Sequence, residues 1–245
     1  MDKPAGPSSF AVVARLRDTS GARAGHAGTL DPFATGLLLV LLGSATRLAR
    51  YLVGLDKRYV TEVDLAARTA TGDPEGAIVK ECDPPSRGEL EARLAALRGE
   101  VDLPVPAASA VKIAGERAYR LARRGVAVEM PVRRSTVREL TLAHYDGVVA
   151  RLELLVSSGT YVRSIADALG GHCASLRRTE VGPFSVDDAD EERILPPVDA
   201  LPFLPLVEVS AADAAAIRQG RRRIGECLRV VQGRELVAVN GTVLP

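Results

Sequence analysis

The chain has 245 residues, of which 47% are apolar, and its 32 basic residues nearly balance 31 acidic ones. This length and composition fit one large domain, or a larger domain with a small appendage, and support a sizeable core. No apolar stretch is long enough to cross a bilayer and no basic-then-apolar signal opens the sequence, so we expect a cytoplasmic protein without a membrane partner.

The distributions of cysteine and arginine indicate which metal or disulfide sites and which binding surfaces to expect. Three scattered cysteines make no disulfide framework, and His172-Cys173 has no second pair at zinc-ligand spacing, so we expect no metal site. Only four basic residues are lysines, and arginine suits phosphate oxygens, although each cluster is also typical of an ordinary solvated surface. The arginines cluster at 117–124, 133–134, 177–178 and 221–223.

The first 42 residues predict a helix, a polar loop and a strand. Ser8 or Ser9 can cap a helix over residues 10–16. In the loop that follows, Asp31 directly precedes Pro32, which keeps it out of helical backbone. The apolar run 37–42 then predicts a buried strand. The pattern indicates a loop that presents one carboxylate, although an Asp-Pro pair alone is equally typical of a structural turn.

Short helices and strands alternate through the middle of the chain. The predicted elements are a helix capped by Ser44 and ending at Gly54, a strand over 57–65, an exposed polar loop over 68–76, a helix over 90–97 opened by a Ser86–Glu89 capping box, a basic helix ending at Gly125, strands over 137–142 and 149–156, a helix that begins near Tyr161 and Arg163 and ends at Gly170, and a strand over 176–184.

Residues 194–245 predict a linker and a small module in place of further large-domain structure. Four prolines in 194–205 predict a linker, and Ser210 then caps a short helix to Gln219. Strands near 228–231 and 236–239 and an Asn240-Gly241 turn complete a small, mostly β module. Overall we predict an α+β fold with a mixed, mostly antiparallel sheet flanked by helices. Without a G-x-G-x-x-G or P-loop string, no nucleotide cofactor is expected.

The string G-H-A-G-T-L-D-P-F-A-T-G at residues 25–36 resembles the signature loop of the TruB-type tRNA pseudouridine synthases at every fixed position. Three later stretches and the start of the chain are similar to that family as well, in the same order. They are D-K-R-Y at 56–59, S-G-T-Y-V-R at 158–163, L-R-R-T-E-V-G-P-F at 176–184 and D-K-P-A-G at 2–6. The resemblance therefore spans residues 2–184.

This resemblance implies a role for each matching residue. Asp31 is implied to be catalytic with Arg163 as its ion-pair partner, an arrangement that keeps the carboxylate charged. Tyr59 would stack on the target uracil and transfer protons, while Tyr161 and Leu176 would line the pocket. Lys3 would support the loop, and His26 would fill the gap left by a flipped nucleotide. The implied layout is a catalytic domain at 1–193, a linker at 194–205 and a PUA-like RNA-binding module at 206–245.

The implied activity is isomerisation of uridine 55 in the tRNA T-loop by a monomer that flips the target base, needing neither metal nor cofactor. Two alternatives stand beside it. A non-catalytic RNA-binding protein could dispense with Asp31, Tyr59 and Arg163, and an Asp-nucleophile hydrolase would want a second nearby acid and a metal.

The sequence departs from the family pattern in three places. The 161–176 segment is shorter, so His172 is not equated with the family's histidine there. Ala70 stands where the family often has Asp, and the tail matches weakly.

Overall fold

The structure is a computed structural model that describes residues 1–113, 115–124, 126, 129–221, 229–233, 235–239 and 242–243. Several predicted features lie outside these ranges, among them Gly125, Arg222–Arg223 and the Asn240-Gly241 turn. None of the helices in the described part of the chain combines the length and the apolar character that crossing a bilayer requires.

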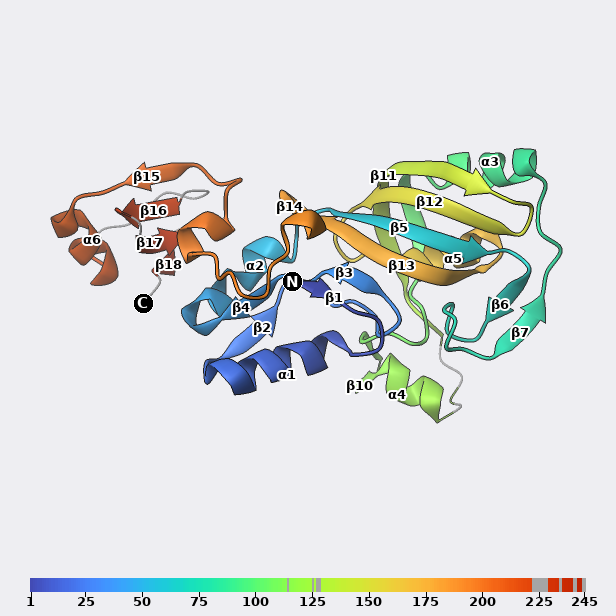
Figure 1. The fold of residues 1–245 in the computed structure, drawn as a ribbon, viewed down its shortest axis with the longest axis horizontal. Helices are drawn as coiled ribbons and strands as arrows, with labels where there is room; N and C mark the ends of the chain where they lie inside the picture. Colours follow the sequence, from blue (N-terminus) through green and yellow to red (C-terminus); the bar gives the residue numbers. More distant parts are fainter. Residues whose placement is uncertain are drawn as a thin grey trace.

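A twisted sheet forms the body of the molecule (Figure 1). Its strands run in the order β1-β3-β13-β5-β12-β11-β8, with β14 paired to β13. Their bounds are β1 (Asp2–Lys3), β3 (Thr35–Leu37), β5 (Lys57–Asp64), β8 (Gly99–Pro104), β11 (Val132–Tyr145), β12 (Val149–Val156), β13 (His172–Val181) and β14 (Phe184–Ser185). Only β3 and β13 pair in parallel within it, which confirms the predicted mixed, mostly antiparallel sheet.

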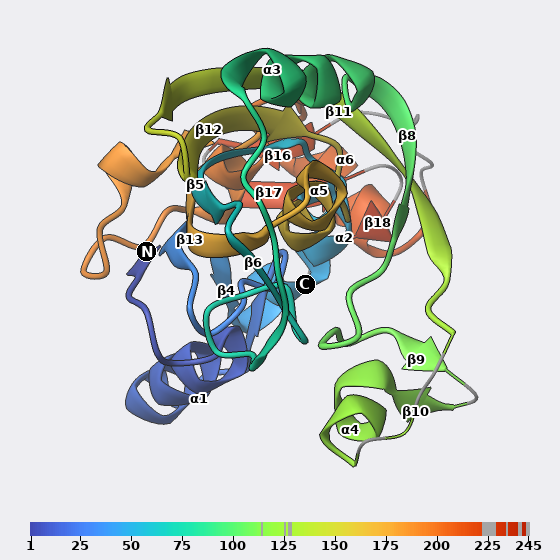
Figure 2. The ribbon, with the colours of Figure 1, turned by 90° about the vertical axis from the view of Figure 1, so that its right-hand side faces the viewer.

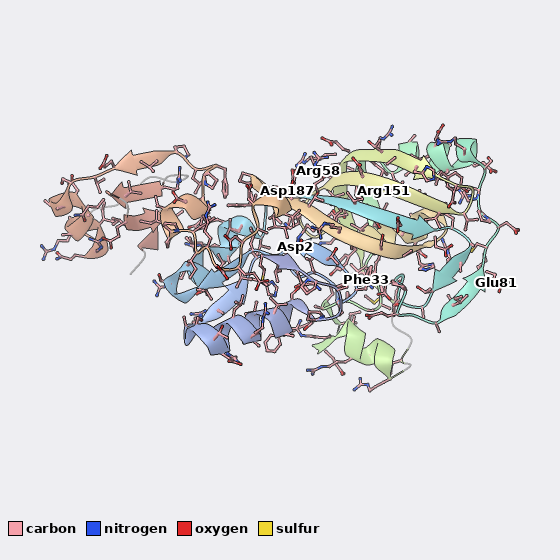
Figure 3. The ribbon with its side chains drawn as sticks, viewed as in Figure 1. Asp2, Phe33, Arg58, Glu81, Arg151 and Asp187 are labelled. Atoms are coloured by element: carbon pink, nitrogen blue, oxygen red, sulfur yellow. The ribbon has the colours of Figure 1, made fainter. Side chains whose placement is uncertain are left out.

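Helices α3 (Arg87–Ala96) and α5 (Val162–Leu169) cover one face of this sheet (Figure 2). Every second side chain of β5 is buried, as the sequence pattern predicts, and Tyr59 and Val63 belong to the core beneath these helices. The intervening residues face outward, where Arg58 and Arg151 lie (Figure 3). Helix α3 opens with the predicted capping box, in which the Ser86 amide donates to the Glu89 carboxylate at 2.8 Å.

The signature loop connects a small two-stranded ladder to the main sheet. Helix α1 (Ser9–Ser20) has Ser8 as its N-cap and leads to β2 (Ala24–His26), which pairs with β4 (Val40–Leu42). The predicted single strand over 37–42 is therefore wrong. The chain leaves the main sheet after β3, where the Leu38 amide donates to the Met1 carbonyl, and enters a different ladder as β4.

Two further predictions need correction. Ser44 caps no helix, because a 3₁₀ helix η1 (Gly43–Leu48) begins one residue earlier without a side-chain cap and continues into α2 (Ala49–Leu52). The prediction of an exposed loop over 68–76 is wrong in part, because Asp73 is buried while Ala70, Pro74 and Glu75 are exposed. These residues belong to the hairpin of β6 (Ala67–Thr69) and β7 (Ile78–Glu81), whose turn places Asp73 inward. Beyond β8, the strands β9 (Lys112–Ile113) and β10 (Glu116–Arg117) and helix α4 (Ala118–Arg123) form a separate projection.

The chain then passes through the short 3₁₀ helices η2 (Val186–Asp188) and η3 (Pro197–Ala200). The C-terminal part is a four-stranded sheet with the Ser210-capped helix α6 (Ala211–Arg218). Its strands are β15 (Leu206–Glu208), β16 (Arg229–Gln232), β17 (Glu235–Val239) and β18 (Thr242–Val243). The proline-rich segment before it is anchored at two buried residues, although Ile194, Leu195 and Phe203 are exposed. Val198 and Leu201 are buried in one cluster with Leu48 and Leu52 of the N-terminal half and Leu236 of the C-terminal sheet.

Candidate active site

The signature loop is fastened to its surroundings by polar contacts on both sides. The Lys3 ammonium is fully buried and donates to the carbonyls of Pro4, Pro7 and Pro32. Gly36 has a φ of +103° and lies directly against the Arg178 backbone, so a Cβ at this position would overlap it. Only glycine therefore fits at this position.

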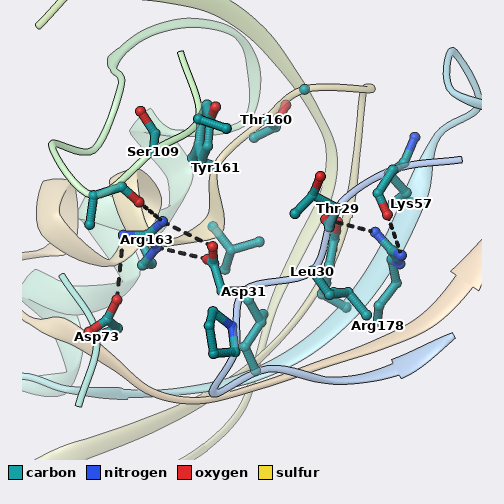
Figure 4. Close-up of a pocket in the computed structure, with 18 of the residues that line it drawn as sticks. Thr29, Leu30, Asp31, Lys57, Asp73, Ser109, Thr160, Tyr161, Arg163 and Arg178 are labelled. Atoms are coloured by element: carbon teal, nitrogen blue, oxygen red, sulfur yellow. Dashed lines mark hydrogen bonds and ion pairs between the residues drawn. The ribbon is translucent and has the colours of Figure 1, made fainter. Parts of the chain in front are cut away.

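Asp31 and Arg163 form the closest ion pair of this region (Figure 4). The Nε of Arg163 donates to one oxygen of Asp31 at 2.9 Å, and Nη2 donates to the other at 3.2 Å. Arg163 lies in the first turn of α5 and its side chain is only 2% exposed, whereas that of Asp31 is 30% exposed. This two-point contact fixes the orientation of the carboxylate while leaving part of it open.

The same guanidinium has a second acidic neighbour that the sequence analysis missed. Asp73 lies 3.5 Å from Nη1 of Arg163, and Thr71 donates to Asp73 and accepts from Arg163 through its carbonyl. The side chain of Asp73 is 9% exposed, although the turn-rich residues around it predict an exposed loop. The sequence signal, an isolated acid after Gly72, was too common in turns to single it out.

Burial raises the pKa of Asp31 above its usual range, and the Arg163 guanidinium opposes this rise. The negative charge of Asp73 adds to the increase, while Lys3 opposes it. Arg163 therefore acts in the expected direction, but the loss of solvent outweighs it. The paired arginine is what favours the charged form in a recess that otherwise disfavours it.

Asp31 faces a cavity of about 830 Å³. Both tyrosines implicated by the sequence, Tyr59 and Tyr161, line this cavity together with Leu176 from β13. Tyr59 on β5 is 7% exposed, and burial raises the pKa of its hydroxyl, which the nearby Arg178 guanidinium opposes. Tyr161 is the N-cap residue of α5, two positions before Arg163. The sheet and α5 thus bring Asp31, Arg163, Tyr59, Tyr161 and Leu176 to one pocket.

The far end of this cavity is cationic. Arg178 is 1% exposed and donates to three backbone carbonyls, at 2.7 Å to Leu37, 3.0 Å to Gly28 and 3.4 Å to Thr29. Lys57 beside it donates to the carbonyls at the end of α2. Burial and the neighbouring Arg178 lower the pKa of Lys57 to about 8. Figure 4 shows Lys57 and Arg178 on the opposite side of Asp31 from Asp73.

Two buried polar atoms of the described residues have no hydrogen-bond partner, Nδ1 of His26 and Oγ of Ser109. His26 lies on β2, and it is not among the residues that line the cavity. Ser109 does line it, and its side chain is 5% exposed. Leaving a buried hydroxyl without a partner costs about 1–3 kcal/mol.

Histidine and cysteine serve local packing near the pocket. His172 is buried and its Nδ1 contacts the Ala67 carbonyl at 2.8 Å. Burial raises the pKa of the Cys173 thiol to about 12, so this thiol stays protonated beside Thr61. Over the described ranges, no three His, Cys, Asp or Glu residues come together as a metal site.

Known proteins are similar to this chain in sequence and in fold. Residues 16–162 match the family described as TruB family pseudouridylate synthase (N terminal domain). The tRNA pseudouridine synthase B of Leifsonia xyli subsp. xyli (strain CTCB07) is 42% identical, covering 92% of this chain and 78% of that protein. That of Thermobifida fusca (strain YX) is also 42% identical, covering 96% and 85%.

A chain in the crystal structure of a Cbf5-Nop10-Gar1 complex superposes with a TM-score of 0.72 at 26% identity, over 99% of this chain and 77% of that one. The shared fold, the family match and the identity over nearly the whole chain confirm the resemblance of the motifs, and the chain belongs to the TruB family of pseudouridylate synthases.

Proposed function

We propose that the protein is a tRNA pseudouridine synthase that converts uridine 55 of the T-loop to pseudouridine. The observation that carries the proposal is the two-point contact of Arg163 with Asp31 at the edge of a cavity lined by two tyrosines. The family of the chain and the names of its relatives supply the reaction and the substrate class.

Asp31 is the catalytic carboxylate in this proposal. The reaction breaks the bond between C1′ of the ribose and N1 of uracil and rejoins C1′ to C5, and a carboxylate can attack or stabilise the separated fragments. Arg163 favours the charged form of Asp31 and fixes its direction, and Asp73 holds the other edge of the same guanidinium. Both effects support a carboxylate that is aligned before substrate arrives.

The remaining residues recognise the base and its surroundings. Tyr59 stacks on the uracil and transfers a proton through its hydroxyl. The raised pKa of this hydroxyl means that it is protonated at neutral pH before the transfer. Tyr161 and Leu176 line the pocket around the base. Lys3 supports the loop through the carbonyl of Pro32, and His26 fills the gap that the flipped nucleotide leaves in the RNA.

The target base must leave its stack, at a cost of a few kcal/mol, before it reaches this pocket. Arginine contacts to phosphates offset that cost. We further propose that the chain acts as a cytoplasmic monomer, with residues 1–193 catalytic, 194–205 a connector, and 206–245 a PUA-like module that grips RNA.

The test is incubation of the purified chain with an unmodified tRNA transcript, followed by mapping of pseudouridine at single-nucleotide resolution. We expect one new pseudouridine, at position 55, and none when that uridine is replaced by cytidine. A transcript that stays unmodified, or is modified only outside the T-loop, would overturn the proposal.

A further inference from the structure

The Ser109 hydroxyl is a buried polar group beside the catalytic pair that has no structural partner in the described part of the chain. Ser109 is 5% exposed and is among the residues that line the cavity, and its Oγ atom, which is itself buried, has no partner among the described residues. A serine hydroxyl can donate one hydrogen bond and accept two, and buried hydroxyls in proteins are ordinarily bonded. The hydroxyl turns with a single side-chain torsion, so an acceptor that enters the cavity can draw it out of its buried position and become the missing partner.

The position of Ser109 is tied to the catalytic pair. Nη2 of Arg163 donates to the carbonyl of Ala108 at 2.9 Å, and the same nitrogen donates to Asp31 at 3.2 Å. One guanidinium thus fixes both the carboxylate and the backbone that carries Ser109. In Figure 4 the side chains of Ser109 and Tyr161 lie on the same side of the Arg163–Asp31 pair.

The proposed reaction needs a contact that survives movement of the base. The bond from C1′ to N1 breaks and the bond from C1′ to C5 forms, while C5 loses a proton and N1 gains one. A half-turn of uracil about the axis through C6 and N3 exchanges N1 with C5. The same turn exchanges the carbonyl oxygens O2 and O4, so a donor that faces one carbonyl before the turn faces the other afterwards.

We propose that Ser109 holds the polar edge of the target uracil by donating its hydroxyl proton to the carbonyl oxygen that faces it, O2 or O4 depending on the orientation of the ring. A freely rotating hydroxyl suits both orientations. Because it is neutral, it adds no charge beside Asp31. This role rests on the proposed function, since it takes the uracil of the target nucleotide as the occupant of the cavity.

Removing the hydroxyl should slow the bound reaction without unfolding the protein. For Ser109→Ala we expect the single-turnover rate at saturating enzyme to fall roughly 2- to 10-fold, the range of one neutral hydrogen bond. Ser109→Thr, which keeps the hydroxyl, should restore most of the rate. Ser86→Ala is the matched control, because its hydroxyl caps α3 away from the cavity and should affect the melting temperature alone.

Sulfur-substituted substrates identify the contact. Sulfur accepts hydrogen bonds poorly, so tRNA carrying 2-thiouridine or 4-thiouridine at the target should react more slowly with wild type. With at least one of these substrates, Ser109→Ala should lose nothing further, because the contact is already weakened. Losses that simply multiply for both substrates, or an Ala variant as fast as wild type on uridine, would overturn the role of Ser109. A wild-type chain that forms no pseudouridine would instead overturn the proposed function.

Discussion

Two buried arginines, Arg163 and Arg178, lie at opposite ends of one cavity and have different partners. Arg163 contacts two carboxylates, Asp31 at 2.9 Å and Asp73 at 3.5 Å. Arg178 is equally buried, and it donates to backbone carbonyls of the signature loop and β3, while its guanidinium also acts on the Tyr59 hydroxyl.

The difference in partners indicates different roles: Arg163 positions an acid, and Arg178 stabilises a loop. A guanidinium between carboxylates changes their charge and direction, which matters to chemistry at those carboxylates. A guanidinium on neutral carbonyls satisfies backbone groups that would otherwise be buried without partners, which matters to stability. The acidic end is therefore expected to govern turnover, and Arg178 to act mainly on folding, with a smaller effect on turnover through Tyr59.

The largest effect is expected at the acidic end, for Asp31→Asn. This change keeps the shape of the side chain but removes its charge and nucleophilicity, so the saturated single-turnover rate should fall by roughly 10⁴-fold or more. Arg163 keeps Asp73 and the carbonyls of Thr71 and Ala108, so the fold should persist. Pseudouridine formation, a tRNA binding titration and a thermal melt measure the three quantities. Steady turnover by a folded variant would show that the reaction does not need the Asp31 carboxylate.

A smaller loss is expected for Tyr59→Phe, which retains the ring and loses the hydroxyl. The aromatic face can still stack on uracil, so tRNA affinity should stay within a few-fold of wild type. General acid–base catalysis contributes about 10²- to 10⁴-fold, and the saturated rate should fall by roughly 10²-fold or more. A rate close to wild type would show that Tyr59 has only a packing role. A loss of tRNA affinity as large as the loss of rate would indicate stacking as its main role.

The smallest effect belongs to the cationic end and depends on pH. The pKa of Lys57 is lowered from 10.5 to about 8, so between these values the unfolded chain keeps a proton that the folded chain has released. The contribution of Lys57 to stability therefore rises with pH in this window. Since solvent screens part of the shift, the gain between pH 7.5 and 9.5 should be on the order of 1 kcal/mol.

Urea unfolding at the two pH values measures this gain, and Lys57→Arg is the comparison because its guanidinium does not titrate there. Arg178 and Asp56 are the charged groups that act on Lys57, and both remain in the variant. The same pH dependence in wild type and in Lys57→Arg would show that other groups cause it.

The sequence predicts most of the site residues at the acidic end of the cavity and few of those at the cationic end. Asp31 stands before a proline and Arg163 at the start of a helix, and both lie in motifs with a family match. Asp73 was missed because its turn reads as solvent-exposed, and only the packing of the β6–β7 hairpin against Arg163 buries it. Local patterns do not report such long-range burial.

The fold shows the same limit. The alternation along β5 and the capping box at Ser86 predict local structure correctly, since both signals are contained in a few adjacent residues. The run 37–42 is uniformly apolar, and nothing within it marks where the chain moves from one sheet to another. That break depends on pairing with Met1–Lys3 and with residues 24–26, which are distant in sequence.

The central claim is that Arg163 serves the chemistry and Arg178 serves mainly the fold, and the matched variants Arg163→Lys and Arg178→Lys test it most directly. Lysine keeps the charge but cannot make the two-point contact. Arg163→Lys should misplace Asp31 and lower the saturated single-turnover rate by about 10²-fold. Arg178→Lys should lose bonds to the loop carbonyls, lowering the free energy of unfolding by about 1–3 kcal/mol while the rate stays within roughly tenfold of wild type. A folded Arg178→Lys protein that loses as much rate as Arg163→Lys would contradict the account.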